Sequence, residues 1–182
     1  MGLNNRSSTN YSYDDMSRLA SVGGAGVTAS YSRVAGTSLL SSTSISDGST
    51  NVLTTDRTYD NINRLTSIAS LAPLALKSSS YVYNNADKRV KAADADSSYW
   101  RYSYDKLGQV VSGVKRDSSG QPIPGFSFGY GYDTIGNRIT SHRGTEAQSY
   151  TSNNLNQYLQ RTIPNQFYIT GRKKAGTFRG II

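Results

Sequence analysis

The chain has 182 residues, of which Ser, Thr, Asn and Gly together fill 74, and only 36% are apolar. Fourteen tyrosines outnumber the 4 Phe and the single Trp. This composition excludes a thick aliphatic core and favours strands and turns, with half-polar tyrosine rings in the buried layer. No apolar run reaches the about 18 residues of a membrane span, and residues 1–6 lack the apolar stretch of a secretory signal.

Cysteine is absent and histidine occurs once, at His142. These counts exclude disulfides, thiolate metal sites and histidine clusters, so we expect no metal and no cofactor. The formal net charge is +8, but much of the excess lies in the Gly-punctuated residues 161–182. That distribution is typical of a solvated tail, and nucleic-acid binding is not expected. If this end did bind nucleic acid, deleting residues 161–182 would abolish retention on DNA. The basic residues concerned are Arg161, Arg172, Lys173, Lys174 and Arg179.

Six copies of one short pattern run through the chain. Each has two aromatic positions separated by one residue, then Asp or Asn, then a polar turn and an apolar residue. The second aromatic positions fall at residues 13, 59, 83, 104, 132 and 152, and ten of the 14 tyrosines occupy aromatic positions of the pattern. The gap between residues 13 and 59 is about twice the others. We therefore expect a decayed repeat there, with Ala29–Val34 as the remnant of its first strand.

Each copy predicts a β-hairpin. Residues i and i+2 of a strand face the same side, so Tyr-x-Tyr places two rings on one face. The following Asp or Asn can bond the backbone two residues on and open a turn. Gly108, Gly136 or Asn63 then tolerates a positive φ, which Ser17 does less readily. The repeat-defining residues are Tyr11, Tyr13, Asp14, Tyr59, Asp60, Tyr81, Tyr83, Tyr102, Tyr104, Asp105, Gly108, Tyr130, Tyr132, Asp133 and Gly136.

The segments between copies predict hairpin tips or inter-repeat loops. Gly23–Gly26 is a flexible break, Ser41–Gly48 a polar stretch, and Asp117–Gly125 a Pro/Gly loop. The copy at Tyr130–Ile139 has one residue more between its Gly and its apolar position. The only helical hint, Ala69–Lys77, is interrupted by a proline. We expect an all-β chain of tandem antiparallel hairpins in a curved, open sheet. Its predicted divisions are a disordered N-terminus (1–9), a repeat array (10–165) and a basic tail (166–182).

These residues resemble the YD-repeat family, also called Rhs repeats. The stretches Asp96–Val110, Tyr132–Arg138 and Asn153–Tyr158 are similar to the shell region of bacterial Rhs-type proteins. The resemblance covers roughly residues 10 to 165. It implies a long β-sheet that spirals into a hollow shell, in bacteria often enclosing a C-terminal toxin and in animal teneurins serving adhesion. It also implies an extracellular or cell-surface location, and partners in the rest of a shell or in an enclosed effector.

The resemblance ends near Pro164. Rhs proteins usually carry an Asp-Pro-x-Gly motif, resembling an aspartyl self-cleavage site, and then a variable toxin, and the sequence shows neither. We expect a truncated or frameshifted fragment of a larger shell. A repeat array needs a neighbour beside each hairpin, so the open sheet edges of such a fragment should self-associate.

Candidate catalytic groups are few. The repeated aspartates could form a carboxylate pair, but a turn-opening role accounts for each of them singly. Glu146 and His142 lie close in sequence with no third group to orient them, so a hairpin loop is the better interpretation. Nucleotide loops, nucleophile elbows and metal-ligand spacings do not occur. We therefore expect no enzymatic activity.

The tyrosine rows allow two interpretations. Exposed rings can stack on sugar faces, with nearby arginines donating hydrogen bonds, which favours a carbohydrate-binding or adhesion module at the cell surface. Alternatively, the arginine stems cover the rings and pair with the turn aspartates, leaving a purely structural wall. A pure wall should show no saturable glycan binding. The candidate ligand-binding residues are Arg18, Arg64, Arg89 and Arg138.

Overall fold

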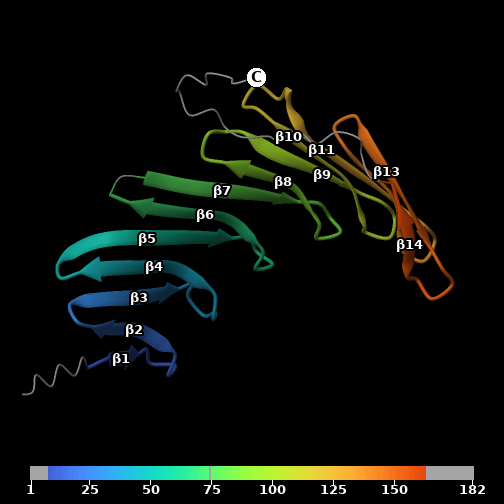
Figure 1. The fold of residues 1–182 in the computed structure, drawn as a ribbon. Coiled ribbons are helices and arrows are strands. Elements are labelled where there is room, and N and C mark those ends of the chain that lie inside the picture. The colour runs from blue at the N-terminus through green and yellow to red at the C-terminus, as the bar shows by residue number, and fades with distance from the viewer. Residues whose placement is uncertain (1–7, 74, 163–182) are drawn as a thin grey trace, which may run out of the picture. The chain divides into compact units, whose positions relative to one another are not determined.

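A computed structural model describes residues 8–73 and 75–162, and within them the chain is all-β (Figure 1). Fourteen strands follow one another in a single sheet whose spatial order is the chain order. The predictions for residues 1–7 of the N-terminus and for the basic tail, residues 166–182, lie outside the described residues. The strands are β1 (Asn10–Tyr13), β2 (Leu19–Gly24), β3 (Val27–Arg33), β4 (Leu40–Asp47), β5 (Thr50–Tyr59), β6 (Leu65–Ala72), β7 (Ala75–Tyr83), β8 (Arg89–Asp94), β9 (Tyr99–Tyr104), β10 (Val110–Arg116), β11 (Pro122–Tyr132), β12 (Arg138–Arg143), β13 (Glu146–Ser152) and β14 (Tyr158–Arg161).

The predicted fold class, tandem antiparallel hairpins in an open sheet, is confirmed. Strands pair antiparallel with their sequence neighbours from β1 to β9 and again from β11 to β14. The chain divides into two compact units, residues 1–101 with 116–120, and residues 102–115 with 121–182. The described residues include no helix. The segment with the helical hint, Ala69–Lys77, lies in the β6–β7 hairpin, with Pro73 at its tip.

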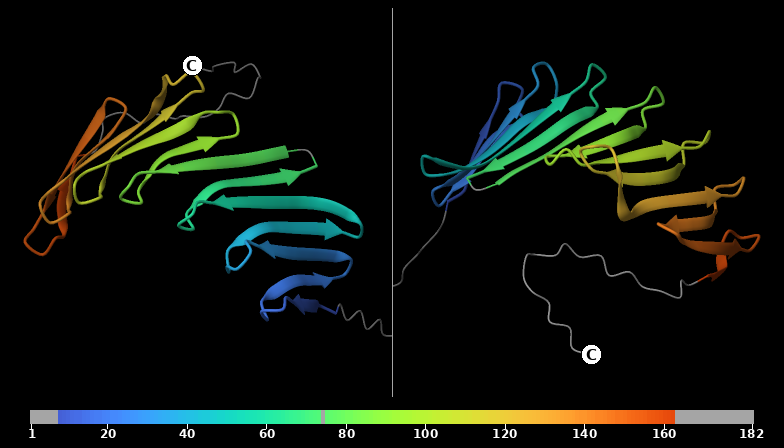
Figure 2. Two further views of the ribbon diagram at one scale, coloured as in Figure 1. Left: turned by 180° about the vertical axis from the view of Figure 1, so that it is seen from behind. Right: turned by 90° about the horizontal axis from the view of Figure 1, so that it is seen from above.

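The sheet has no hydrophobic core. Among the described residues no apolar side chain is buried, and the one buried polar residue is Ser98, at 6% exposure. The strands of the first unit form a single layer when viewed from above (Figure 2). Backbone ladders and cross-strand side-chain pairs therefore carry most of the cohesion, and the absence of a thick aliphatic core agrees with the composition.

The two faces of the first unit differ in chemistry. On one face small hydroxyl residues oppose one another, and the Oγ atoms of Ser12 and Ser21 lie 2.6 Å apart. Thr58 and Ser67 repeat this contact at 2.6 Å. The other face carries the tyrosines and the apolar residues, as in the row that runs across the first five strands. That row is Tyr11, Val22, Ala29, Ile45 and Leu53.

Two predicted loops are wrong. Ser41–Gly48 is almost entirely strand, because it lies within β4, where its alternating hydroxyl and β-branched residues pair with both neighbours. In the stretch Asp117–Gly125 only the first part is loop. Strand β11 starts at Pro122, where a missing N–H is tolerated at the first residue of a strand.

The segment expected to hold a decayed repeat forms the β3–β4 hairpin, and β3 covers the predicted strand Ala29–Val34 except for Val34. Tyr31 and Arg33 occupy its aromatic positions, and Arg33 pairs with Leu40 across a bulge. This turn is one residue longer than the others, which pair residues 13 with 19 and 59 with 65. In the copy at Tyr130–Ile139, one residue more separates the glycine from the apolar position. Its turn has the common length, because Tyr132 pairs with Arg138 rather than with the apolar residue that follows.

Candidate functional site

Six turns share one geometry, and in the first unit they lie at one end of the strands (Figure 1). We call each an Asx turn, because it begins at the Asp or Asn after the second aromatic position. In the first, Asp14 Oδ1 accepts hydrogen bonds from the backbone N–H groups of Met16 at 3.0 Å and Arg18 at 2.9 Å. The other five repeat both bonds at 2.8 to 3.1 Å. The turn-opening role predicted for these residues is confirmed. They are Asp14, Asp60, Asn84, Asp105, Asp133 and Asn153.

A residue with positive φ sits at the same place in every Asx turn, four positions after the second aromatic residue. Gly108 and Gly136 hold it at φ values of 79° and 92°. Asn, Asp and Ser hold it in the remaining turns, at 56° to 66°. Ser17 is the least suited of these, because serine adopts the left-handed region less readily than Asn or Asp. Backbone conformation and side-chain bonding therefore select the same turn at each repeat.

The carboxylates of Asp14 and Asp60 are stabilised in their charged form. A hydrogen bond from the backbone of Arg18 is the largest influence on Asp14, and its pKa is lowered. At Asp60, partial burial acts to raise the pKa, but bonds from the backbone and guanidinium of Arg64 outweigh it and the pKa is lowered. Both groups therefore favour the folded chain while they are ionised.

A side chain of one Asx turn reaches the next turn along the sheet. Arg64 Nε donates to Asp60 Oδ2 at 2.6 Å, and its Nη1 bonds Asp87 Oδ1 of the following turn. Arg18 likewise donates to the carbonyl of Thr37 in the turn of the decayed repeat. The two ion pairs of Arg64 are partly solvated, so each contributes modest energy. Their main effect is to fix the spacing of successive turns.

The second unit makes the same link without charge. Asn137 Nδ2 donates to Asp133 Oδ2 at 2.8 Å and to Asn156 Oδ1 of the next turn at 3.2 Å. The side-chain bond from Asn137 is also the main cause of the lowered pKa of Asp133. An amide and a guanidinium therefore serve the same position in different repeats.

Tyrosine hydroxyls at the second aromatic position join neighbouring hairpins. Tyr83 donates from its hydroxyl to the carbonyl of Leu65 at 2.8 Å. Leu65 is the first residue of the preceding return strand, β6. We call this contact the inter-repeat tyrosine bond. Two more repeats make it at 2.9 and 3.1 Å, with donor and acceptor Tyr59 and Leu40, and Tyr132 and Val110.

The last repeat makes a related contact with the opposite hydrogen-bond direction, although Ser152 replaces its second tyrosine. Tyr158 pairs with Ser152 across the hairpin, and its hydroxyl accepts a hydrogen bond from the backbone N–H of Arg138, 3.1 Å away. Arg138 is the first residue of the preceding return strand, β12. The ring has moved to the opposite strand, yet it still bonds the backbone of the preceding hairpin.

The four candidate ligand-binding arginines fall into two groups. Arg18 and Arg64 lie in the Asx turns and bond the turn residues. Arg89 lies with its guanidinium carbon 4.1 Å from the Tyr81 ring centroid, and Arg138 lies 4.6 Å from that of Tyr150. These contacts are the ones that the structural-wall interpretation predicts, since each arginine contacts a ring or a turn carboxylate. Carbohydrate binding by these residues stays a prediction.

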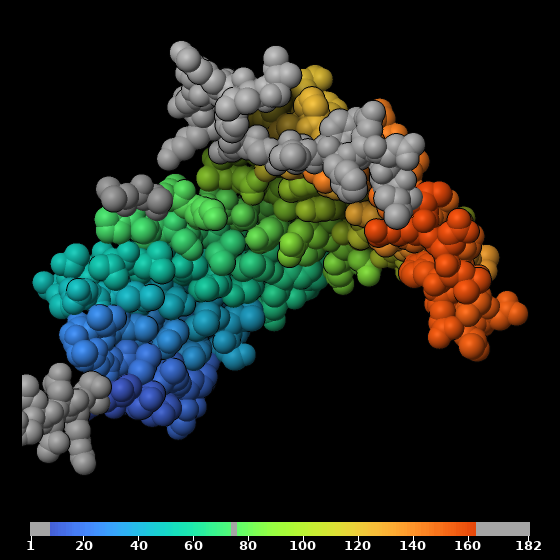
Figure 3. Space-filling view, viewed as in Figure 1, coloured from blue at the N-terminus to red at the C-terminus, as the bar shows by residue number. Residues whose placement is uncertain are grey.

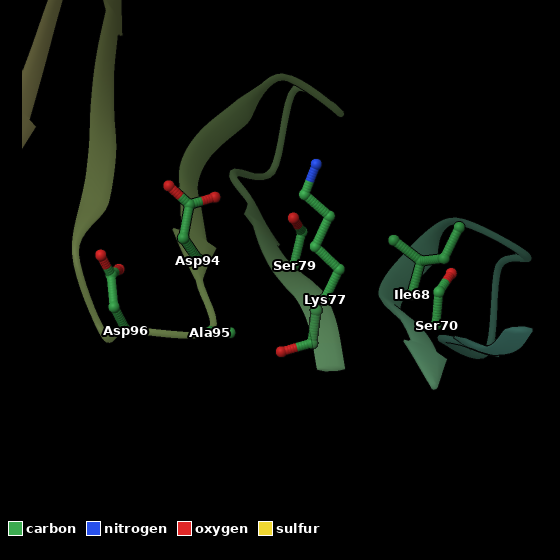
Figure 4. A pocket seen from close by; sticks show the side chains of 8 residues that line it. Ile68, Ser70, Lys77, Ser79, Asp94, Ala95 and Asp96 are labelled. Atoms are coloured by element: carbon green, nitrogen blue, oxygen red, sulfur yellow. The ribbon is translucent and has the colours of Figure 1, made fainter. Parts of the chain in front are cut away.

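A hollow of about 550 Å³ lies in the first unit, at the strand ends opposite the Asx turns. The side chain of Lys77 lies in it between those of Asp94 and Ile68 (Figure 4). Its lining includes no histidine or cysteine. Across residues 8–73 and 75–162, no three His, Cys, Asp or Glu side chains group in a way that could hold a metal ion. The same residues include no helix long and apolar enough to cross a membrane.

Sequence reasoning found the turn-opening residues and the rings but missed the contacts between repeats. The inter-repeat tyrosine bond joins residues 18 to 22 positions apart. The spacing of the copies was a usable signal, because tandem hairpins place each second tyrosine beside the preceding return strand. No residue pattern shows that the hydroxyl, rather than the ring, makes the contact.

Comparison with solved structures places this fold among chains of toxin complexes. A crystal structure of TcdB2-TccC3-Cdc42 superposes with a TM-score of 0.52 at 11% sequence identity, over 82% of this chain and 10% of that chain. A Tc holotoxin pore from Photorhabdus luminescens matches at a TM-score of 0.45 and 16% identity, over 79% of this chain and 9% of that one. The chain thus spans about a tenth of the length of these neighbours.

At 11% identity the first of these matches shows the fold. That fold is an antiparallel sheet of tandem hairpins, shared with one part of a much longer toxin-complex chain. No protein-family model matches the sequence, and no curated protein matches it.

Proposed function

We propose that this chain is a non-catalytic wall segment of a YD/Rhs-repeat shell, which encloses or presents a C-terminal effector as part of a larger protein. The observation that supports this proposal is the set of contacts between repeats. Asx turns and inter-repeat tyrosine bonds join several successive hairpins, in a sheet whose described residues bury no apolar side chain. Such a sheet acts through its extent and continuity.

The physics of repeat arrays supports a wall. Each unit is stabilised by nearest-neighbour contacts, so a longer array forms a larger continuous surface without a new core. The chain covers only a tenth of the TcdB2-TccC3-Cdc42 neighbour, which is the proportion expected of one segment in a larger wall. Its partners in this proposal are the rest of the shell and the enclosed effector. Its location, following the family resemblance, is extracellular or at the cell surface.

The flanking coding sequence provides the first test. We expect tyrosine-aspartate repeats to continue upstream and an effector to be encoded downstream. The second test expresses residues 1–182 together with those flanking repeats and measures protease resistance of the downstream segment. Deleting residues 10–162 should expose that segment to cleavage. Flanking DNA without repeats in any frame, or cleavage unchanged by the deletion, would contradict a wall.

Carbohydrate binding is the second candidate function, favoured by the exposed rings at one edge. Tyr11 and Tyr13 are 60% and 63% exposed and lie on the same face of β1. Rings exposed in this way can stack on sugar faces. A glycan array with the full chain and with Tyr11→Ala tests it. Saturable binding that the substitution removes supports the candidate, and its absence from the unaltered chain contradicts it.

A further inference from the structure

We propose that two copies of this chain join head to tail, with β14 of one copy pairing with β1 of the other in the register that joins successive hairpins within the chain. The inference rests on the proposed wall function, because both require hairpins that add laterally. It goes further by naming the partner as a second copy and by fixing the residues that meet. Among the described residues, β1 and β14 are the two ends of the strand order.

One register rule governs the junctions between consecutive hairpins. In four regular junctions, the residue eight positions after one second aromatic position pairs with the residue three positions before the next. At the decayed repeat the turn is one residue longer, and Ser42, nine positions after Arg33, pairs with Asp56, three before Tyr59. The regular pairs are Ser21 with Ser30, Ser67 with Ser80, Lys91 with Arg101, and Thr140 with Ser149.

Applied to the free edges, this rule places Gln160 of one copy opposite Asn10 of the other. Gln160 lies eight positions after Ser152, and Asn10 lies three before Tyr13. Both are exposed. β14 is the return strand of the last hairpin, and β1 is the first strand of the first hairpin. A return strand pairs antiparallel with the first strand of the next hairpin, so β14 and β1 would also run antiparallel. The joint therefore reproduces a junction that the chain already makes several times.

The two edges also offer complementary hydrogen-bonding groups. Tyr13 holds the second aromatic position of the first hairpin, and its hydroxyl has no partner among the described residues because no strand precedes β1 there. Tyr158 is the first residue of β14, the place whose carbonyl accepts the inter-repeat tyrosine bond in other repeats. A head-to-tail joint brings this donor and this acceptor together.

A second link follows from the Asx turns. Gln157 holds the position from which Asn137 reaches the next turn, and its Oε1 accepts a bond from Asn153 at 2.9 Å. Its amide N–H groups would meet Ser17 of the second copy, which holds the receiving position. Pairing β1 with β1, or β14 with β14, would satisfy neither link. The complementary contact is heterologous, so it leaves a free edge at each end and permits longer chains.

Cysteine trapping tests the joint, because the native sequence has no cysteine. Two full-length variants, Asn10→Cys and Gln160→Cys, are oxidised separately and as a mixture. A head-to-tail joint predicts a covalent dimer in the mixture and only background in each separate sample, since opposed positions in a strand pair meet disulfide geometry. Dimers in the separate samples, or none in the mixture, overturn the proposal. Replacing Gln160→Cys by Ser149→Cys, whose strand position is already paired, provides the matched control.

Sedimentation of the unaltered chain and of two hydroxyl deletions provides a second measurement. Tyr13→Phe should weaken association by about five-fold, the effect of one neutral hydrogen bond. Tyr11→Phe on the same strand should have a smaller effect, because the inter-repeat tyrosine bond is made from the second aromatic position. Equal effects of both substitutions contradict the predicted joint.

A chain that is folded by circular dichroism yet stays monomeric at the highest soluble concentration also overturns this proposal. A monomeric chain would not contradict the wall function, because repeats encoded in the same polypeptide could then pair with both edges. Failure of the flanking-repeat test would instead remove the wall function and leave the self-association data valid.

Discussion

The two ends of the strands are built on different principles. At one end, Asx turns of nearly identical geometry repeat, and side chains of several of them reach the next turn. At the other end the hairpin tips vary from a two-residue connection at Ala25–Gly26 to the longer loop between β10 and β11. In the space-filling view the strands of the first unit adjoin in chain order (Figure 3). The sheet therefore continues evenly although the tips differ.

This difference indicates where the repeat is specified. The Asx-turn end combines a carboxylate acceptor, a left-handed residue and a side chain that reaches the next turn. A tip needs only to reverse the chain within the right register, a requirement that many sequences meet. Substitutions at the Asx-turn end should therefore cost more stability than comparable ones at the tips.

Acid should produce the largest loss. The pKa values of Asp14, Asp60 and Asp133 are lower in the fold than their ordinary value of 3.8. The unfolded chain then binds more protons, so their stabilisation is complete above about pH 4 and is lost as pH falls through the lowered folded values. Thermal melts from pH 7 to pH 2 should show a midpoint that drops steeply below about pH 4. Asp60→Asn should reduce this drop, and an equally steep drop in that variant would argue against the turn carboxylates as its cause.

Removing one turn carboxylate should come next. Asp60→Ala leaves two backbone N–H groups and the Arg64 guanidinium without their acceptor, so we expect the melting midpoint to fall by roughly 10 °C. The control is Asp47→Ala, at the opposite end of the strands, where the exposed side chain opens no Asx turn and the midpoint should move by about 2 °C or less. Equal shifts in the two variants would mean that the ends do not differ.

Glycine substitutions sharpen the difference further. Gly136 has φ of 92°, and an added Cβ would lie 3.0 Å from the Gln109 amide, so Gly136→Ala should destabilise by about 2 kcal/mol. Gly144 at a tip has φ of 59° and no atom within 4 Å of an added Cβ. Gly144→Ala should therefore cost only about 1 kcal/mol. Urea unfolding measures both, and the reverse ranking would contradict the prediction.

The smallest expected effect concerns a single hydroxyl. Tyr83→Phe keeps the ring but removes the bond to the Leu65 carbonyl, which should cost about 1 kcal/mol. Tyr81→Phe keeps the ring beneath Arg89 and should change stability by less than about 0.5 kcal/mol. Urea midpoints of the two variants test whether the aromatic positions have separate roles. Identical midpoints would show that only the rings matter.

Much of the fold could be predicted because local signals agreed. Tyr-x-Tyr alternation, the following Asp or Asn, and a residue suited to positive φ all indicated hairpins at the same places. The errors concerned the loops, which were predicted from a composition rich in polar residues and not from a pattern of strand pairing. Ser41–Gly48 looks like a loop by its serines, yet strand pairing on both sides orders its hydroxyl residues.

The candidate site was predictable in part. Asp14 and its equivalents were found because their bonds are local, within four residues. The pairing of Arg64 with Asp60 follows from the predicted contact between arginines and turn aspartates. The bonds of Arg64 to Asp87 and of Tyr83 to Leu65 were not found, because these partners lie about 20 residues away and depend on the spacing between repeats. A single sequence shows which side chains recur, but it does not show which atoms of distant repeats meet.

A sheet whose described residues bury no apolar side chain should also respond unusually to temperature. The heat-capacity increment of unfolding reflects newly hydrated apolar area, and it amounts to about 12–15 cal/mol/K per residue in ordinary domains. This chain has less such area to expose, so its increment per residue should be lower. Its stability curve would then be broad and shallow, with cold unfolding displaced to temperatures far below freezing.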